Sequence, residues 1–304
     1  MASFRARLVN LALPLLGIKR FFSEPELMSE RLAKARKRKP ERPKAKWSKV
    51  FDIVEDTSRG YPVVTITPKQ GTKRGAPHLL YLHGGGYVLD IAGLHFETVC
   101  RLCQMLGASA TVPVYPLAPE HKAPEILAAM RALYAEVSER HGAENVTVMG
   151  DSAGGGMSLA LAQMLKTDGG ARPASLVLWS PWLDATAGAE GQAAIEPDDR
   201  MLAQVGLESC AAMYGGDVPP DDPRLSPLFG DLADLPPTAI FSGTSDILLV
   251  DGRRLAEKFH ALGKTDFEYH EYADMFHVWM LLPVPEGKEA LARTADFIAE
   301  AHAA

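Results

Sequence analysis

The sequence predicts an α/β fold with a mostly parallel sheet. Short apolar runs at residues 78–82 and 109–115 are each followed by a helical pattern, which is the alternation expected of a parallel sheet flanked by helices. Residues 124–142 carry their apolar side chains on one helical stripe. A chain of 304 residues with 47% hydrophobic and 23% charged residues can bury one large core. We therefore expect one α/β domain with an accessory cap.

The remaining elements of the main domain follow from their own patterns. Residues 50–54 and 62–67 are short apolar runs bounded by turn residues, and they are expected to form antiparallel edge strands. Further strands are predicted at 174–179, 238–242 and 267–272. Helices are predicted at 255–262, which Gly263 closes, and at 286–302.

The segment between residues 184 and 237 breaks the alternation of strands and helices. Gly, Pro and Asp clusters surround one helical run at 201–214. The segment is too long for a simple connection, so it is expected to pack over a site as a lid. The predicted organisation is an N-terminal cap segment at 1–49 and a main domain at 50–304, with a second cap segment at about 185–222.

The N-terminal segment differs in composition from the rest of the chain. Residues 8–18 are apolar but interrupted by Asn10 and Pro14, and no cleavage-site pattern follows, so they predict a cap helix, with peripheral membrane contact as one alternative. Residues 31–49 hold ten Lys or Arg and one Glu, a charge of +9 that leaves −15 for the remainder. Because only Trp47 offers an aromatic platform there, a solvated connector facing an acidic body is favoured over a nucleic-acid or anionic-membrane patch. No stretch approaches the ~20 apolar residues that cross a bilayer.

The three cysteines predict free thiols and a cytoplasmic location. Their number is odd, and Cys100 and Cys103 lie one helical turn apart. A zinc or redox site is the alternative reading of this spacing, but no second ligand pair matches it. We expect no metal, no cofactor and no nucleic-acid partner.

A serine in a tight turn is the first chemical motif. Residues 145–156 predict a short apolar strand, a sharp turn and the start of a long helix, with Ser152 at the bend in the pattern G-x-S-x-G. A Cβ atom at Gly150 or Gly154 would collide with the neighbouring chain. The turn would push the Ser152 hydroxyl out at the carboxyl edge of the sheet. A Gly-rich connection that only packs or binds a phosphate is the alternative.

A glycine-rich loop supplies a candidate oxyanion site. His83 and three glycines follow directly on the strand predicted at 78–82. Their unobstructed peptide N–H groups can point at a developing negative charge, with the amide of Ala153 as a further donor. An ordinary glycine turn is the alternative.

The candidate base is His277, which lies just beyond the last predicted strand. His270 falls inside that strand and His260 on an amphipathic helix, so neither is favoured. The candidate acid is Asp246, which follows the strand at 238–242. Its rival Asp251 stands at the start of a helix and is expected to be an N-terminal cap.

Together these motifs resemble the bacterial hormone-sensitive-lipase-like esterases of the α/β-hydrolase fold. The likeness covers the chain from about residue 77 to its end and rests on six ordered motifs, which are HGGGY at 83–87, YPLAPE at 115–120, GDSAGG at 150–155, SPWLD at 180–184, SPL at 226–228, and the segment 246–277.

This resemblance implies an α/β-hydrolase fold with a mostly parallel eight-stranded sheet, flanking helices and a helical cap. It also implies a site in which each residue has a defined role: nucleophile Ser152, base His277, orienting carboxylate Asp246, and an oxyanion hole formed by the amides of Gly84, Gly85 and Ala153.

Two positions depart from the family pattern. Val278 stands where many relatives have Gly, and Pro116 stands where an arginine is common. Neither change removes a catalytic atom, but both affect the shape of the pocket. The substrate pocket is expected to draw on aromatic and apolar side chains near the strand ends, for which a plain core role is the alternative: Tyr87, Trp179, Trp182, Met275, Phe276 and Trp279.

The predicted function is a serine carboxylic-ester hydrolase that forms an acyl-enzyme. An apolar pocket favours short to medium uncharged esters or lactones as the small-molecule partner. An amide hydrolase and a non-catalytic ligand receptor of the same fold are the alternatives. A homodimer is one alternative for the assembly.

Overall fold

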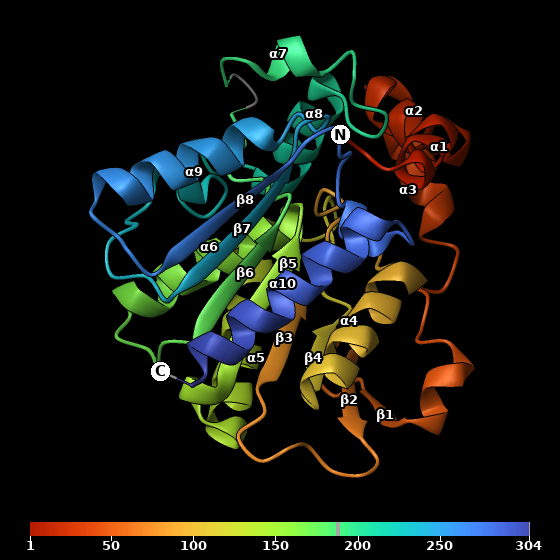
Figure 1. The fold of residues 1–304 in the computed structure, drawn as a ribbon. Coiled ribbons are helices and arrows are strands. Elements are labelled where there is room, and N and C mark those ends of the chain that lie inside the picture. The colour runs from red at the N-terminus through yellow and green to blue at the C-terminus, as the bar shows by residue number, and fades with distance from the viewer. Residues whose placement is uncertain (187–188, 304) are drawn as a thin grey trace.

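The computed structural model describes residues 1–186 and 189–303. A single sheet lies at its centre (Figure 1) and consists of β1 (Phe51–Asp56), β2 (Val63–Pro68), β3 (His78–Leu82), β4 (Ser109–Pro113), β5 (Val146–Asp151), β6 (Ser175–Trp179), β7 (Thr238–Gly243) and β8 (Phe267–Tyr272). The order is β1-β2-β4-β3-β5-β6-β7-β8. Only the β1–β2 and β2–β4 pairs are antiparallel. The expected eight-stranded, mostly parallel sheet is confirmed.

Helices cover both faces of this sheet. On one face, α4 (Gly93–Leu106) packs against α10 (Pro285–Ala301), and Figure 1 shows both in front of the strands. The other face carries α5 (Ala123–His141), α6 (Ala153–Thr167) and α9 (Leu249–Ala261). Strands β3 to β7 are buried along their whole length because helices lie on both sides of them. The core therefore forms two layers, one on each face of the sheet.

The N-terminal helices form a cap beside the carboxyl ends of the parallel strands. They are α1 (Phe4–Ala12), α2 (Ile18–Ser23) and α3 (Met28–Ala35), and α2 packs on α8 (Gln204–Gly215), as Figure 1 shows. The single helix expected at 8–18 is wrong. Pro14 lies in the first turn of a 3-10 helix at Leu13–Leu16, and Gly17 ends this helix with a φ of 73°, so the chain turns between α1 and α2.

The basic connector that follows the cap faces acidic groups of the main domain, as expected. Arg36 pairs with Glu120 at 3.2 Å, and Lys46 pairs with Glu97 at 2.5 Å. Such partly exposed pairs each contribute up to about 1 kcal/mol. Their role is mainly to fix the path of the chain between cap and sheet.

Cys100, Cys103 and Cys210 are buried free thiols. Across the described residues, no helix combines the length and the apolar character that crossing a membrane requires. The second cap segment includes the short helix α7 (Gln192–Ile195) and α8.

Candidate active site

Ser152 lies in a strained turn between β5 and α6. Its φ of 54° and ψ of −123° fall in a region that residues with a side chain seldom adopt. A Cβ atom at Gly154 would lie 2.0 Å from the carbonyl oxygen of Leu82, and one at Gly150 would lie 2.4 Å from the Gly154 backbone. Both glycines are therefore required by close backbone approach. The turn exposes Ser152 to an internal cavity.

His277 and Asp246 form a buried pair at the ends of adjacent strands. Asp246 follows β7 and His277 follows β8, and the imidazole Nδ1 donates a hydrogen bond to Asp246 Oδ2 at 2.8 Å. Burial acts to lower the pKa of His277, but the charge and the hydrogen bond of Asp246 outweigh it and hold this pKa above the ordinary imidazole value. The rival His270 is paired with Glu268 in β8, and His260 is exposed on α9.

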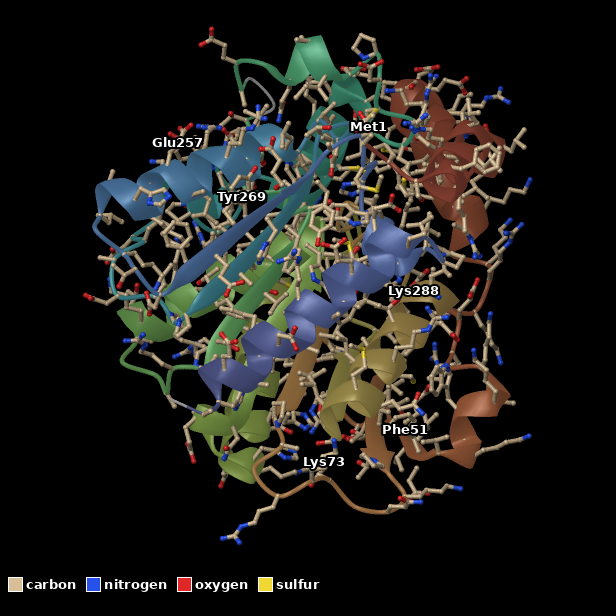
Figure 2. All side chains as sticks on the ribbon, in the orientation of Figure 1. Met1, Phe51, Lys73, Glu257, Tyr269 and Lys288 are labelled. Carbon is tan, nitrogen blue, oxygen red and sulfur yellow. The ribbon has the colours of Figure 1, made fainter. Side chains whose placement is uncertain are left out.

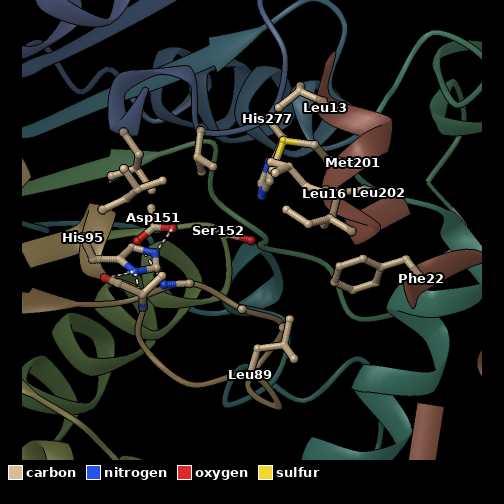
Figure 3. A pocket seen from close by; sticks show the side chains of 18 of the residues that line it. Leu13, Leu16, Phe22, Leu89, His95, Asp151, Ser152, Met201, Leu202 and His277 are labelled. Carbon is tan, nitrogen blue, oxygen red and sulfur yellow. Dashed lines mark hydrogen bonds and ion pairs between the residues drawn. The ribbon is translucent and has the colours of Figure 1, made fainter. Parts of the chain in front are cut away.

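Ser152 and His277 line the same cavity. Figure 3 shows the imidazole of His277 extending toward Ser152. Among the described side chains, the Ser152 hydroxyl and His277 form no hydrogen bond with each other. Such contacts are often long in enzymes without substrate and tighten when substrate binds.

The amide N–H groups that the glycine loop leaves free are not the ones predicted. The N–H of Gly84 donates to Asp151 Oδ1 at 2.9 Å, so the expectation that Gly84 is an oxyanion donor is wrong. Gly85 and Gly86 line the cavity with φ values of 112° and 63°, and no acceptor is found for their N–H groups in the described part of the chain. Ala153 is the first residue of α6, so its N–H has no acceptor within the helix. The free donors are therefore Gly85, Gly86 and Ala153.

Asp151 holds this loop in place, a role that the sequence patterns did not suggest. Besides Gly84, its buried carboxylate accepts from the Tyr81 hydroxyl at 2.5 Å and faces His95 Nε2 at 3.5 Å. Burial acts to raise the pKa of Asp151, but His95 and the hydrogen bond from Tyr81 lower it below the usual value. An ionised Asp151 thus fixes Gly84, which orients the next two peptide units.

The cavity beside Ser152 is small and mostly apolar. Its volume is about 210 Å³. Besides the glycine loop, Ser152 and His277, its walls come chiefly from the N-terminal cap, the second cap segment and the loop after β8, with side chains that include Leu13, Leu16, Ile18, Phe22, Leu89, Met201, Leu202, Leu207, Val278, Leu281 and Leu282. Figure 3 shows Leu13, Leu16, Met201 and Leu202 close to His277.

The aromatic residues expected to line the pocket lie elsewhere. The rings of Tyr87 and Tyr214 stack with centroids 3.7 Å apart, and Trp182 lies beside Tyr87. Trp279 packs on Tyr272, and the side chain of Phe276 is fully buried. Trp179 and Met275 are also fully buried, and neither lines the cavity. The prediction of Tyr87, Trp182, Phe276 and Trp279 as pocket residues is therefore wrong, because these side chains pack into the core behind the site.

Asp199 joins the second cap segment to the loop that carries Asp246. Its Oδ1 accepts from the N–H groups of Met201 at 2.7 Å and Leu202 at 2.8 Å, and its Oδ2 accepts from Ile247 N–H at 2.9 Å. Burial, and next the charge of Asp246, raise the pKa of Asp199 to about 6. No motif in the sequence indicated this contact, because Asp199 meets Asp246 only through the fold.

Asp251 is not the helix cap that the sequence predicts. It lies within the first turn of α9, and its Oδ2 accepts from the N–H groups of Leu183 at 2.7 Å and Asp184 at 3.1 Å. Burial raises the pKa of Asp251 to about 7. This carboxyl therefore links α9 to the loop after β6.

Val278 follows the candidate base in a left-handed conformation. Its φ of 50° suits glycine, and a β-branched residue is strained there. Val278 also lines the cavity. The departure noted in the sequence thus narrows the cavity next to His277.

Comparisons with known proteins find the same fold in esterases. A family model described as the alpha/beta hydrolase fold matches residues 79–281. An esterase of Acinetobacter venetianus is 34% identical over 226 residues, which cover 72% of this chain and 73% of that protein. The crystal structure of EstE5 soaked with p-nitrophenyl butyrate matches with a TM-score of 0.86 at 28% identity over 100% of both chains. An esterase of the bacterial hormone-sensitive lipase family matches with a TM-score of 0.76 at 30% identity, covering 86% of this chain and 87% of that one.

The chain therefore belongs to the α/β-hydrolase family, in its hormone-sensitive-lipase-like branch. It is a carboxylic-ester hydrolase of the esterase and lipase type. In the described part of the chain, no group of three or more His, Cys, Asp or Glu is arranged to hold a metal ion.

Proposed function

We propose that this protein hydrolyses short to medium uncharged esters or lactones through an acyl-enzyme on Ser152. One observation carries the proposal: the strained Ser152 turn opens on the same cavity as an imidazole that Asp246 orients. This is the arrangement that nucleophilic acyl transfer requires.

The chemistry proceeds in two steps. Ser152 Oγ attacks the ester carbonyl carbon while His277 Nε2 takes the hydroxyl proton, and the amides of Gly85, Gly86 and Ala153 stabilise the oxyanion. His277 then gives that proton to the departing alcohol oxygen. A water molecule, deprotonated by His277, attacks the acyl group next, so the acid leaves and Ser152 regains its proton. Asp246 keeps the imidazole in the required tautomer and stabilises its charged form.

The cavity supports an uncharged substrate of limited size. Its walls are mostly aliphatic and its volume is about 210 Å³. A negatively charged acyl group would lose its hydration there and would meet the carboxyl groups of Asp90 and Asp151, which also line the cavity. EstE5, a structural relative, was soaked with p-nitrophenyl butyrate, a short uncharged ester.

The test compares p-nitrophenyl esters from acetyl to dodecanoyl with matched anilides and with lactones. We expect turnover of the short esters or lactones, little turnover of the anilides, and labelling of Ser152 by a fluorophosphonate. The Ser152→Ala variant should lose activity by on the order of 10⁵-fold. Faster cleavage of the anilides would instead indicate an amide hydrolase. No turnover and no labelling would favour a ligand receptor.

A further inference from the structure

An apolar face covers the outer side of the N-terminal cap. It consists of Phe4, Leu8, Leu11, Leu15 and Leu16, whose exposed fractions lie between 50% and 88%. Phe4, Leu8, Leu11 and Leu15 recur at intervals of three and four residues, which is the spacing of one helix face. Figure 2 shows the side chains of these N-terminal helices projecting away from the sheet. A cluster of this kind marks an interaction site in a folded protein.

The charged side chains within the segment that carries this face are all positive. Residues 1–23 hold Arg5, Arg7, Lys19 and Arg20 and no Asp or Glu, although the whole chain carries a net charge of −6. Arg5 and Arg7 are exposed on α1, and within the described residues neither forms an ion pair. A cationic rim beside an apolar helix face complements an anionic lipid surface.

The cap is fixed to the main domain while it presents this face outward. The Ser3 hydroxyl donates to Glu286 of α10 at 3.0 Å, and the N–H of Ala2 donates to Asp274 at 3.0 Å. Leu13 is buried beneath the face. The inner side of the cap thus already contacts the main domain, and the exposed apolar side chains lie on its outer side.

The apolar face continues into the cavity. Leu16 is exposed on the outside and also lines the cavity that holds Ser152 and His277, and Figure 3 shows Leu13 and Leu16 of the same 3-10 turn beside His277. Any partner surface that binds the apolar face would therefore also lie next to the edge of the cavity.

We propose that the apolar face and the rim of Arg5 and Arg7 dock this protein on an anionic phospholipid surface, from which the cavity takes its ester. The second half of this statement rests on the proposed hydrolase function; the docking itself does not. A second copy of the chain fits the face less well. A symmetric pair would bring arginines of one cap against those of the other, with no carboxylate in residues 1–23 to neutralise them.

The test measures sedimentation of the Ser152→Ala protein with vesicles of phosphatidylcholine alone or mixed equally with phosphatidylglycerol. Binding should require phosphatidylglycerol and weaken with salt. In the double variant Leu8→Gln and Leu11→Gln, two leucine side chains can no longer insert into the lipid. Its partition coefficient from water onto these vesicles should therefore fall about a hundredfold. Replacing Arg5 and Arg7 by Gln should lower it roughly thirtyfold. None of these four residues lines the cavity.

The matched control replaces two exposed apolar residues far from the cap, Val54 of β1 and Leu262 after α9, with Gln. This control should bind vesicles like the parent. Equal loss in control and cap variants, or no binding to either vesicle, would overturn the proposal. A concentration-dependent dimer that the Leu8 and Leu11 changes dissolve, without vesicle binding, would assign the face to a second copy.

Activity on a water-soluble short ester, measured separately on proteins with Ser152 intact, keeps the two proposals apart. The cap variants should retain that activity but lose the extra rate on ester dissolved in anionic vesicles. Vesicle binding without any hydrolysis would contradict the hydrolase and leave docking standing.

Discussion

At the residue scale, the proposed reaction depends on the free imidazole of His277. Only its unprotonated form can accept the Ser152 proton. Asp246 holds the pKa of His277 above its ordinary value despite burial. The same contact that orients the base thus also shifts the pH at which the base becomes available.

We expect kcat/KM for an uncharged ester to fall as the pH drops through the raised pKa of His277. The midpoint should lie above the ~6.5 of an unperturbed imidazole. The measurement is a pH–rate profile at substrate concentrations well below KM. A profile that stays flat from mildly alkaline to mildly acidic pH would contradict His277 as the base.

At the element scale, Asp199 couples a pocket wall to the proposed triad. It binds the amides of Met201 and Leu202, which line the cavity, and that of Ile247, which follows Asp246. Its negative charge also acts to raise the pKa of His277. One side chain of the second cap segment therefore influences both substrate fit and base strength.

The Asp199→Asn variant should move the acidic limb of the pH profile down by roughly half a unit, because one negative charge near His277 is removed. Its kcat should fall roughly tenfold. The NH₂ group of asparagine cannot accept a hydrogen bond, so at least one of the backbone N–H groups that now donate to Asp199 would lose its partner. The neighbouring Asp198 is exposed, so Asp198→Asn is the matched control. If kcat fell but the acidic limb of the pH–rate profile did not shift, Asp199 would have only a structural role.

At the scale of the whole molecule, a buried carboxyl links stability to pH. Asp251 has a folded-state pKa raised to about 7, and its Oδ1 has no hydrogen-bond partner in the described part of the chain. A raised pKa means that its stabilising contribution is complete below the unfolded value of ~3.9 and is lost as the pH rises through about 7. Asparagine in its place would keep an oxygen for Leu183 and Asp184 without a charge.

We therefore expect the unfolding free energy of Asp251→Asn, relative to the parent, to rise by roughly 2–3 kcal/mol between pH 5 and 8. Denaturant unfolding at both pH values gives this difference, in which the contributions of other groups cancel. Asp251→Ala leaves two buried N–H groups unpaired and should be destabilised at either pH. A pH-independent difference for the asparagine variant would show that folded Asp251 is already ionised throughout this range, so that its pKa is not raised.

Local patterns alone located most elements of the fold. The strands at 78–82 and 267–272 were predicted with their observed bounds, and the helix at 124–142 is shifted by one residue at each end. Apolar period and turn residues act over a few positions, so they can be read without the fold. Pro14 was identified as an interruption of residues 8–18, but the left-handed turn at Gly17 that separates α1 from α2 was not predicted.

The site divides in the same way. The sequence by itself determined the serine turn, because Gly150 and Gly154 allow the close backbone approach that the turn needs, and it placed Asp246 and His277 after neighbouring strands. Only the tertiary structure decided that Asp151 occupies the amide of Gly84, that Asp199 reaches the Asp246 loop, and that leucines of the cap, not tryptophans, surround the cavity. These contacts join residues far apart in the chain. Which of them meet depends on how the helices and strands pack, because each buried polar group must find a hydrogen-bond partner among the groups that packing brings near it.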